Sequence, residues 1–280
     1  MNASVTTRLE GENMGVAYGE HTVLNGVDFQ VPEGELTVIL GPNACGKSTT
    51  LKALARVNPL KDGEVRLDGT PLPQMKSRAI AKILAMLPQT PEAPSGVTVA
   101  DVVARGRYPH QSLLRSWSDE DEQACVEAMQ AANVLELAER PIEALSGGQR
   151  QRVWIAMTLA QQTPLILLDE PTTYLDITHQ IEVLNLTKKL HSEGRTVAVV
   201  LHDLNLAFRY ATHVVLMKQG RIIAQGDPRA IITPELIQEV FDLQSVIIPD
   251  PCTGTPLVIP KENQTIHIAA DAISAARESK

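Results

Sequence analysis

The stretch GPNACGKST, Gly41–Thr49, places two glycines, a proline and a lysine between an apolar run and a helical pattern. It fits G-x-x-x-x-G-K-[ST], a loop whose backbone N–H groups surround a polyphosphate while the lysine reaches the outer phosphates and the hydroxyl binds Mg²⁺. Glu35–Leu40 before it is short, apolar and partly β-branched, as expected of a buried strand. Leu51 and Leu54 follow it at helical spacing. Because strand, loop and helix occur in this order, the stretch predicts a nucleotide-phosphate site.

The loop itself supplies most of the groups expected to contact a nucleotide. These are Gly41, Pro42, Asn43, Ala44, Cys45, Gly46, Lys47, Ser48 and Thr49. Cys45 lies two residues before Lys47 and beside a helix N-terminus. A neighbouring cation and the helix dipole both favour the thiolate, so the sequence predicts that the pKa of Cys45 lies below its ordinary value. The alternative is a small buried side chain that reagents do not reach.

Length and composition exclude several classes of protein. The 280 residues are enough for one large α/β domain or two small ones. No apolar run approaches the ~20 residues that span a bilayer, and the start, MNASVTTRLEGEN, lacks a secretory pattern, so no export is expected. The three cysteines form neither a metal spacing nor a disulfide framework, which suits a reducing cytosol. A net charge of −8 and only 3% aromatic residues argue against nucleic-acid binding.

Alternating strand-like and helix-like segments indicate the fold class. LILLD (Leu165–Asp169) and TVAVVL (Thr196–Leu201) read as buried strands between helical patterns. The sequence therefore predicts an α/β fold, with a P-loop NTPase core of mostly parallel sheet and flanking helices, an antiparallel β subdomain and an inserted helical subdomain. We expect the core with its β subdomain at 1–92 and 160–245, the helical signature subdomain at 93–159, and a short C-terminal extension of two strands and a polar tail at 246–280.

Two acids, Asp169 and Glu170, stand at the end of the apolar strand that begins at Leu165. Carboxylates at the end of a buried strand are costly unless they meet a cation or a polar site. Asp169 is expected to hold Mg²⁺ through water, and Glu170 to polarise an attacking water as general base. The alternative is an acidic strand end exposed to solvent.

The segment LSGGQRQR, Leu145–Arg152, carries Ser146 three residues before Gln149, which is the pattern of a capping box. We expect a helix from Gln149, and such a start is common in proteins of every function. Two adjacent glycines at a helix N-terminus also form an anion receptor. His202, at the end of another strand, is a third candidate, although a lone histidine is more often structural.

In combination, these segments resemble the ATP-binding-cassette (ABC) ATPases. The Walker A loop at 41–48, LSGGQ at 145–149, LLDEP at 167–171 and the His-Asp pair at 202–203 occur in the order and approximate spacing of that family, and the resemblance covers almost the whole chain. It implies that ATP and Mg²⁺ bind, and that the LSGGQ of one subunit closes over ATP held by the Walker A loop of a second copy. The roles it implies are Lys47, Glu170 and His202 in catalysis; Ser48, Gln89 and Asp169 at the metal; Tyr18 stacking on adenine; Ser146, Gly147, Gly148 and Gln149 at the partner's ATP; and Asp176 at the dimer interface.

Longer strings are similar to the ATPase subunits of ferric-siderophore importers. They are VARGRYPHQ (103–111), YLDITHQIEVLNL (174–186), HDLNLAFRYATHVVLMKQGRIIAQG (202–226) and IIPDPCTGTPLVIP (247–260). This resemblance implies a peripheral protein at the cytoplasmic face of the inner membrane, which drives uptake through separate permease subunits contacted near Gln89. A siderophore-binding protein would be an indirect partner, and nucleic acid none. Ala44 departs from the family, which commonly has glycine there; if the position needs a left-handed φ, alanine costs about 1–2 kcal/mol.

Other functions remain open at this point. Related vitamin B12 and haem importers share the general plan, and the cargo itself is not readable from this chain. A soluble ABC protein of DNA repair, translation or cluster assembly would be favoured by coiled-coil arms, tandem cassettes or strongly basic linkers, and the sequence has none of these. A purely regulatory nucleotide-binding module needs no general base, so Glu170 and His202 argue against it.

Overall fold

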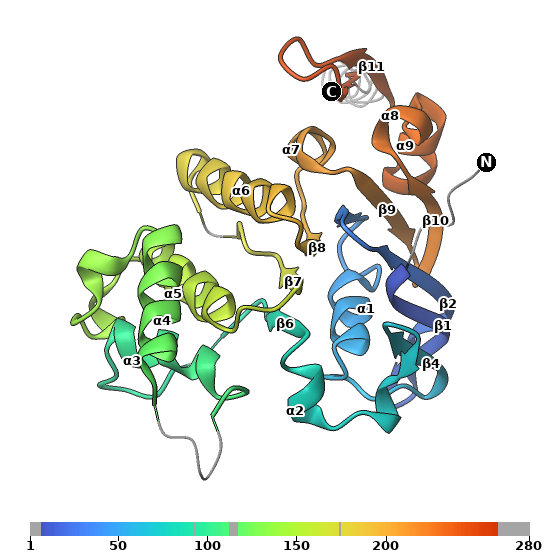
Figure 1. Ribbon diagram of the computed structural model, residues 1–280. Coiled ribbons are helices and arrows are strands. Elements are labelled where there is room, and N and C mark those ends of the chain that lie inside the picture. The colour runs from blue at the N-terminus through green and yellow to red at the C-terminus, as the bar shows by residue number, and fades with distance from the viewer. Residues whose placement is uncertain (1–6, 92, 112–116, 174, 263–280) are drawn as a thin grey trace, which may run out of the picture.

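The computed structural model describes residues 7–91, 93–111, 117–173 and 175–262 (Figure 1). Its strands are β1 (Thr7–Tyr18), β2 (His21–Pro32), β3 (Leu36–Leu40), β4 (Asp62–Leu67), β5 (Thr70–Pro71), β6 (Leu84–Leu87), β7 (Leu165–Asp169), β8 (Thr196–Val200), β9 (His213–Lys218), β10 (Arg221–Gly226), β11 (Ser245–Pro249) and β12 (Pro256–Pro260). Its α-helices are α1 (Lys47–Leu54), α2 (Ser77–Ile80), α3 (Val99–Ala104), α4 (Asp119–Ala131), α5 (Gly147–Ala160), α6 (Ile177–Ser192), α7 (Leu204–Tyr210), α8 (Pro228–Ile231) and α9 (Pro234–Phe241).

The central sheet has the strand order β10-β9-β3-β8-β7-β6. The pairs from β9 to β6 are parallel, and only β10 at the edge runs antiparallel. Every residue of β3, β7 and β8 is buried, because both faces of this sheet are covered. The predicted α/β fold with a mostly parallel sheet is confirmed.

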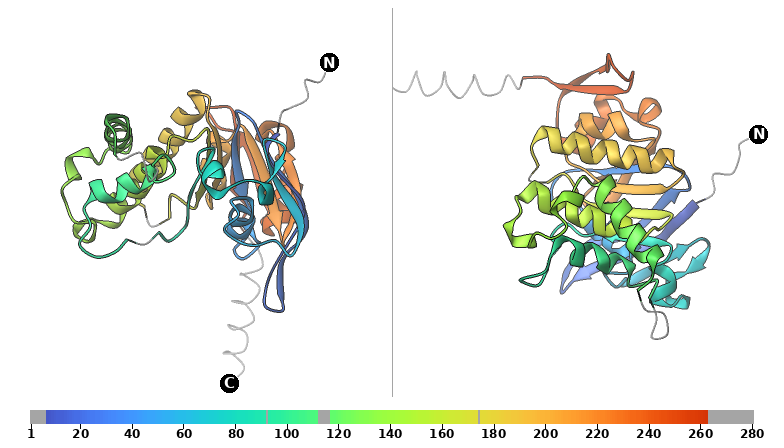
Figure 2. Two further views of the ribbon diagram at one scale, coloured as in Figure 1. Left: turned by 60° about the horizontal axis from the view of Figure 1, so that its bottom comes forward. Right: turned by 60° about the vertical axis from the view of Figure 1, so that its left-hand side comes forward.

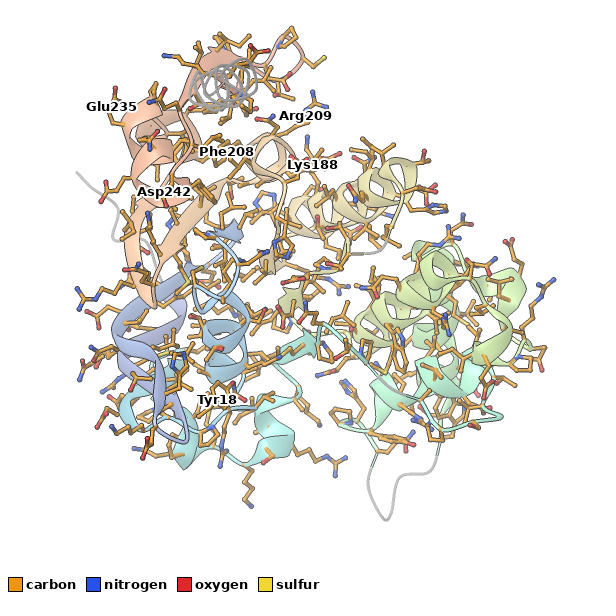
Figure 3. The ribbon with its side chains drawn as sticks, turned by 180° about the vertical axis from the view of Figure 1, so that it is seen from behind. Tyr18, Lys188, Phe208, Arg209, Glu235 and Asp242 are labelled. Atoms are coloured by element: carbon orange, nitrogen blue, oxygen red, sulfur yellow. The ribbon has the colours of Figure 1, made fainter. Side chains whose placement is uncertain are left out.

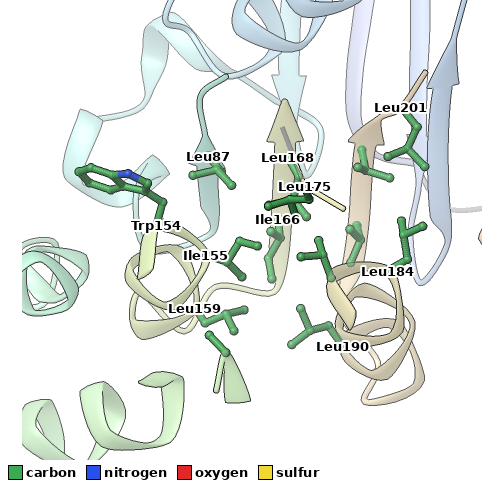
Figure 4. Close-up of a cluster of buried hydrophobic side chains, with 14 of the residues drawn as sticks. Leu87, Trp154, Ile155, Leu159, Ile166, Leu168, Leu175, Leu184, Leu190 and Leu201 are labelled. Atoms are coloured by element: carbon green, nitrogen blue, oxygen red, sulfur yellow. The ribbon is translucent and has the colours of Figure 1, made fainter. Parts of the chain in front are cut away.

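Alternate residues of these strands enter two separate hydrophobic clusters. Ile166 and Leu168 of β7 point to the side of α5 and α6, where Ile155 and Leu184 meet them (Figure 4). The intervening residues, such as Leu167, face α1 and the antiparallel sheet. The period of two along each strand thus fixes which layer each side chain joins.

The second sheet is antiparallel, with the order β2-β1-β4-β5. Its β4–β5 hairpin turns at Asp68 and Gly69, both with positive φ (48° and 75°), as the Asp-Gly pair predicts. The β9–β10 hairpin turns likewise at Gln219 and Gly220 (φ 49° and 72°). In both hairpins the turn ends in a glycine, which adopts a positive φ without steric cost.

Helices α3, α4 and α5 pack on one another at one side of the molecule (Figure 2). Ser118 caps α4 through a capping box, as its acidic first turn suggests. Ser146 does the same for α5, so that helix begins at Gly147, two residues earlier than predicted.

The C-terminal part forms an antiparallel hairpin of β11 and β12, as predicted. It lies beyond α8 and α9, above α7 in Figure 1. The expected polar tail falls from 263 onward, outside the described residues. Among the described helices, none has the length and apolarity needed to cross a bilayer.

Candidate active site

The phosphate loop leaves β3 and enters α1 through backbone conformations that favour glycine. Gly46, the N-cap of α1, has φ 106°. A Cβ at Gly41 would overlap the carbonyl oxygen of Met217, so only glycine lets the loop approach β9 this closely. Ala44 has φ 60°, so this alanine does occupy a left-handed conformation. Gly46 caps α1 without a side-chain hydrogen bond, and the N-terminus of a helix is favourable for binding an anion.

Lys47 is 95% buried, with 5% of its surface exposed, although it carries a charge. Its Nζ donates to the carbonyl oxygens of Gly41 and Pro42, each at 2.9 Å. These two bonds hold the ammonium group at the floor of the loop. A cation fixed there attracts an anionic ligand without a further ordering cost.

Asp169 ends β7 with a carboxylate that is fully buried. Neither oxygen receives a hydrogen bond of normal geometry from the described residues, and the nearest cation is Lys52, with Nζ 3.7 Å from Oδ2. Burial raises the pKa of Asp169, whereas the nearby Ser48 hydroxyl and Lys52 ammonium group partly lower it. A buried carboxylate with free lone pairs beside a serine hydroxyl fits a hydrated Mg²⁺. Among the described residues, no group of three or more His, Cys, Asp or Glu side chains is placed to hold a metal ion.

Glu170 is held by three donors at once. His202 Nε2 lies 2.8 Å from Oε1, while Gln89 Nε2 and Thr173 Oγ1 donate to Oε2 at 2.7 Å and 3.1 Å. Burial opposes ionisation, but the hydrogen bonds from His202, Thr173 and Gln89 lower the pKa of Glu170 below its ordinary value. Glu170 also has a positive φ, 52°, a strained conformation for a glutamate. The carboxylate is therefore ionised and fixed in direction at neutral pH.

An open cleft brings these parts together. The predicted site residues that line it are Asn43, Ala44, Cys45, Gly46, Lys47, Ser48, Thr49, Gln89, Glu170 and His202. Three further residues line the cleft that were not predicted from the sequence: His21, Val23 and Thr173. Thr173 follows Glu170 by three residues, the usual spacing for a side-chain hydrogen bond within a turn, and that signal was available. His21 and Val23 carry no local signal, because only sheet packing brings β2 to the loop.

The prediction for Cys45 is wrong. The side chain is 4% exposed and belongs to the hydrophobic cluster beneath the loop. Burial raises the pKa of its thiol, and the nearby charge of Lys47 only partly opposes this. Desolvation exceeds the attraction of the cation because the sulfur points into the core rather than into the phosphate cradle.

Tyr18 does not line this cleft. It ends β1 with 53% of its surface exposed, and its hydroxyl accepts a hydrogen bond from Asn58 Nδ2 at 2.6 Å (Figure 3). Its cross-strand partner, His21, does line the cleft. Stacking of Tyr18 on adenine therefore stays a prediction.

The LSGGQ segment lies away from the cleft, at the start of α5. Ser146 and Gln149 cap each other, with Gln149 Oε1 accepting from Ser146 N at 3.0 Å, and Gly147 is exposed. Asp176 caps α6, where its Oδ1 accepts from the backbone N and from Nδ1 of His179 at 3.0 Å and 2.7 Å. Within one chain, these residues do not join the phosphate loop.

Comparison with known proteins agrees with this geometry. Residues 24–173, more than half of the chain, match the ABC transporter family model. The chain is 49% identical over 254 residues to the ferric enterobactin transport ATP-binding protein FepC of Escherichia coli (strain K12), covering 90% of this chain and 94% of that protein. It is 49% identical over 253 residues to the petrobactin import ATP-binding protein FpuD of Bacillus anthracis, covering 90% and 93%. It also superposes on a chain of an inward-facing ABC transporter described as of metal-chelate type, with a TM-score of 0.77, 28% identity and coverage of 92% of this chain and 98% of that chain. The chain therefore belongs to the ABC transporter family, as one of its ATP-binding subunits.

Proposed function

We propose that this protein hydrolyses ATP at the cleft between the phosphate loop and Glu170, and that the reaction powers import of a ferric siderophore through separate permease subunits. The arrangement of Glu170, clamped by Gln89, Thr173 and His202 at the edge of the loop, carries the proposal. A fixed, ionised carboxylate beside a phosphate cradle is suited to accept a proton from water.

The chain's own residues divide the chemistry. Lys47 and the N–H groups at the start of α1 bind the β- and γ-phosphates, and Glu170 orients the attacking water. His202 contacts the γ-phosphate while it holds Glu170. Ser48, Gln89 and Asp169 hold Mg²⁺, which when bound neutralises charge on the phosphates.

Two copies of the chain complete the site. The exposed start of α5, with Ser146, Gly147, Gly148 and Gln149, closes over the ATP held by the other copy, and Asp176 lies at the same interface. The exposure of Gly147 at the N-terminus of α5 supports this assignment. We further propose that the chain divides into a core (1–92 and 160–245), a helical subdomain (93–159) and a C-terminal extension (246–280). Gln89 and the helical subdomain would transmit motion to the permease.

The cargo is proposed from the relatives. Those with about half of their residues identical carry names of ferric enterobactin and petrobactin import. A siderophore-binding protein would then deliver the cargo, and the subunit would sit peripherally at the cytoplasmic face of the inner membrane. Only the ATPase cycle belongs to this chain, because permease and binding protein select the ligand.

Uptake measurements in cells test the cargo. Replacement of Lys47 by alanine in the chromosomal gene is expected to abolish accumulation of radiolabelled ferric siderophore and to leave uptake of simple iron salts unchanged. A Lys61→Ala strain serves as control, because Lys61 lies outside the cleft. Normal siderophore uptake together with lost haem or vitamin B12 uptake would refute the siderophore assignment while leaving the ATPase assignment intact.

A further inference from the structure

The C-terminal hairpin of β11 and β12 has no part in the cleft, yet it is fixed firmly to the fold. Val258 on β12 is buried, and Ile247 on β11 packs partly buried against the same hydrophobic cluster. The opposite face of the hairpin is exposed, with Val246 43% and Ile248 40% accessible. On this inward side, β12 meets α7 and β11 meets α9.

Asn205, on the first turn of α7, joins this helix to β12. Its Nδ2 donates to the carbonyl oxygen of Val258 at 3.2 Å, and its Oδ1 accepts from the N–H of Val258 at 2.7 Å. The side-chain amide therefore pairs with both backbone groups of one strand residue, as a neighbouring strand would. Because Val258 is 4% exposed, losing Asn205 would leave two buried polar groups unpaired.

Arg209, one turn further along α7, makes a second connection. Its Nε and Nη2 both donate to Oδ2 of Asp250, at 3.1 Å and 2.7 Å. Asp250 is buried, and its Oδ1 accepts from the backbone N–H groups of Cys252 and Thr253, which closes the hairpin turn. Hydrogen bonds from Arg209 and from this turn hold the pKa of Asp250 below its ordinary value. Figure 3 places Arg209 between α7 and the hairpin.

The short segment that leads into the same helix carries the histidine that contacts Glu170. Only Leu201, His202 and Asp203 separate β8 from α7, and Asp203 caps α7 by accepting from Leu206 N at 2.8 Å. On the β8 side, Leu201 N donates to Ile39 O at 3.2 Å, which fixes one end of this short segment to the sheet. The other end is fixed through α7, and therefore through Asn205 and Arg209.

We propose that Asn205 and Arg209 are positioning residues for ATP hydrolysis, which hold His202 in reach of Glu170 by anchoring α7 to the C-terminal hairpin. The inference rests on the proposed function of His202 and Glu170. It gives residues 245–260 a role in the reaction, because contacts with this hairpin hold α7 in place. A displacement of reacting groups by about 1 Å can cost on the order of 10²-fold in rate, so a modest shift of α7 is enough to matter.

Steady-state ATPase measurements on the full-length protein test this inference. Arg209→Ala and Asn205→Ala are each expected to lower kcat by about 5- to 20-fold while KM for ATP changes less than about twofold, because the phosphate loop is untouched. Arg209→Lys keeps the charge toward Asp250 and is expected to recover part of the rate. Arg229→Ala is the matched control: Arg229 Nη2 donates to Thr253 O of the same hairpin at 3.3 Å, but from α8. Its kcat is expected to match the wild type.

A double-mutant cycle with His202→Ala separates positioning from a general loss of structure. In the His202→Ala background, single-turnover phosphate release is expected to be unchanged by Arg209→Ala, since the residue through which Arg209 acts is missing. An equal loss of rate in both backgrounds would overturn the inference, and so would an unaltered kcat in Arg209→Ala and Asn205→Ala. Wild-type protein without ATPase activity would instead refute the proposed function itself.

Discussion

The phosphate loop and the start of α5 each lead into the N-terminus of a helix, but they differ in what surrounds them. Around the loop, Lys47 is buried and bonded, and Glu170 takes three donors from its own chain. At α5, Ser146 and Gln149 satisfy each other, and nothing in the described structure lies within 4 Å of a Cβ placed on Gly147. One region is assembled within a single chain, whereas the other is exposed, with open space around Gly147.

Folding of one chain therefore pre-organises the phosphate loop and Glu170, whereas the proposed role of the start of α5 requires a second copy. A buried ammonium and a clamped carboxylate are fixed before ATP arrives, so they contribute without reorganisation. Under the proposed function, the start of α5 would contribute only when a second copy brings it to the nucleotide. ATP binding and ATP hydrolysis should therefore respond differently to changes in the two regions.

The largest effect is expected for Glu170→Gln. The amide keeps the size of the side chain but cannot take the proton from water, so kcat is expected to fall by about 10²–10⁴-fold. ATP binding is expected to persist, because Lys47 and α1 are unchanged, and the unhydrolysed ATP should hold two copies together. Light scattering with Mg-ATP measures this dimer; a monomer at saturating ATP would contradict the idea that two copies share each ATP.

Gly147→Asp is expected to impair only the start of α5 and to leave the phosphate loop intact. A side chain there meets open space, so the fold should persist, while its charge repels the phosphates of the other copy. We expect a loss of about 10–10²-fold in kcat with ATP binding retained, and a much smaller loss for Gly147→Ala as the uncharged control.

Mixing two inactive variants sharpens the same test. Gly147→Asp and Lys47→Ala damage opposite halves of the shared site, so a mixed dimer contains one intact site. Partial recovery of ATPase activity on mixing is the expected outcome. Failure of the mixture to exceed either variant alone would argue that each chain hydrolyses ATP with its own α5.

Ala44→Gly tests the strain inside the loop. The left-handed φ of 60° costs alanine about 1–2 kcal/mol, which the substitution by glycine removes. Glycine also gives the unfolded chain more conformational freedom, which offsets about 0.4–1 kcal/mol of this gain in folding stability. We expect the melting temperature to rise by about 2–4 °C. Ala131→Gly, at the exposed last residue of α4, is the control and is expected to lower it. A fall of similar size in both variants would show that position 44 is not strained.

The smallest effect on activity is expected from thiol modification. Cys252 is exposed whereas Cys45 and Cys125 are buried, so N-ethylmaleimide should react first at Cys252 and leave hydrolysis nearly unchanged. Burial raises the pKa of Cys45, and burial likewise raises that of Cys125 to about 11, which disfavours the reactive thiolate at neutral pH. Mass spectrometry that finds Cys45 labelled first, with loss of activity, would show that the loop opens more than its packing indicates.

By itself, the sequence determined the parts that depend on neighbours along the chain. The strand, glycine loop and helix around Lys47, the capping boxes at Ser118 and Ser146, and the hairpins at Asp68-Gly69 and Gln219-Gly220 follow from local backbone preferences and short side-chain bonds. The acids at the end of β7 were also visible, because a charge at the end of an apolar run is costly without a purpose. The mostly parallel sheet followed from the alternation of such segments.

Only the tertiary structure decided which side chains face the cleft and which face the core. It turned Cys45 into the core against the attraction of Lys47, because the direction of a side chain at the loop is set by packing under the sheet. It added His21 to the cleft, and it joined Asn205 to Val258 across more than fifty residues of sequence. Contacts of this kind leave no mark in local spacing, since they depend on how sheets and helices stack. The physical reason is that conformational preferences act between neighbours along the chain, whereas burial and desolvation depend on everything that folding brings near.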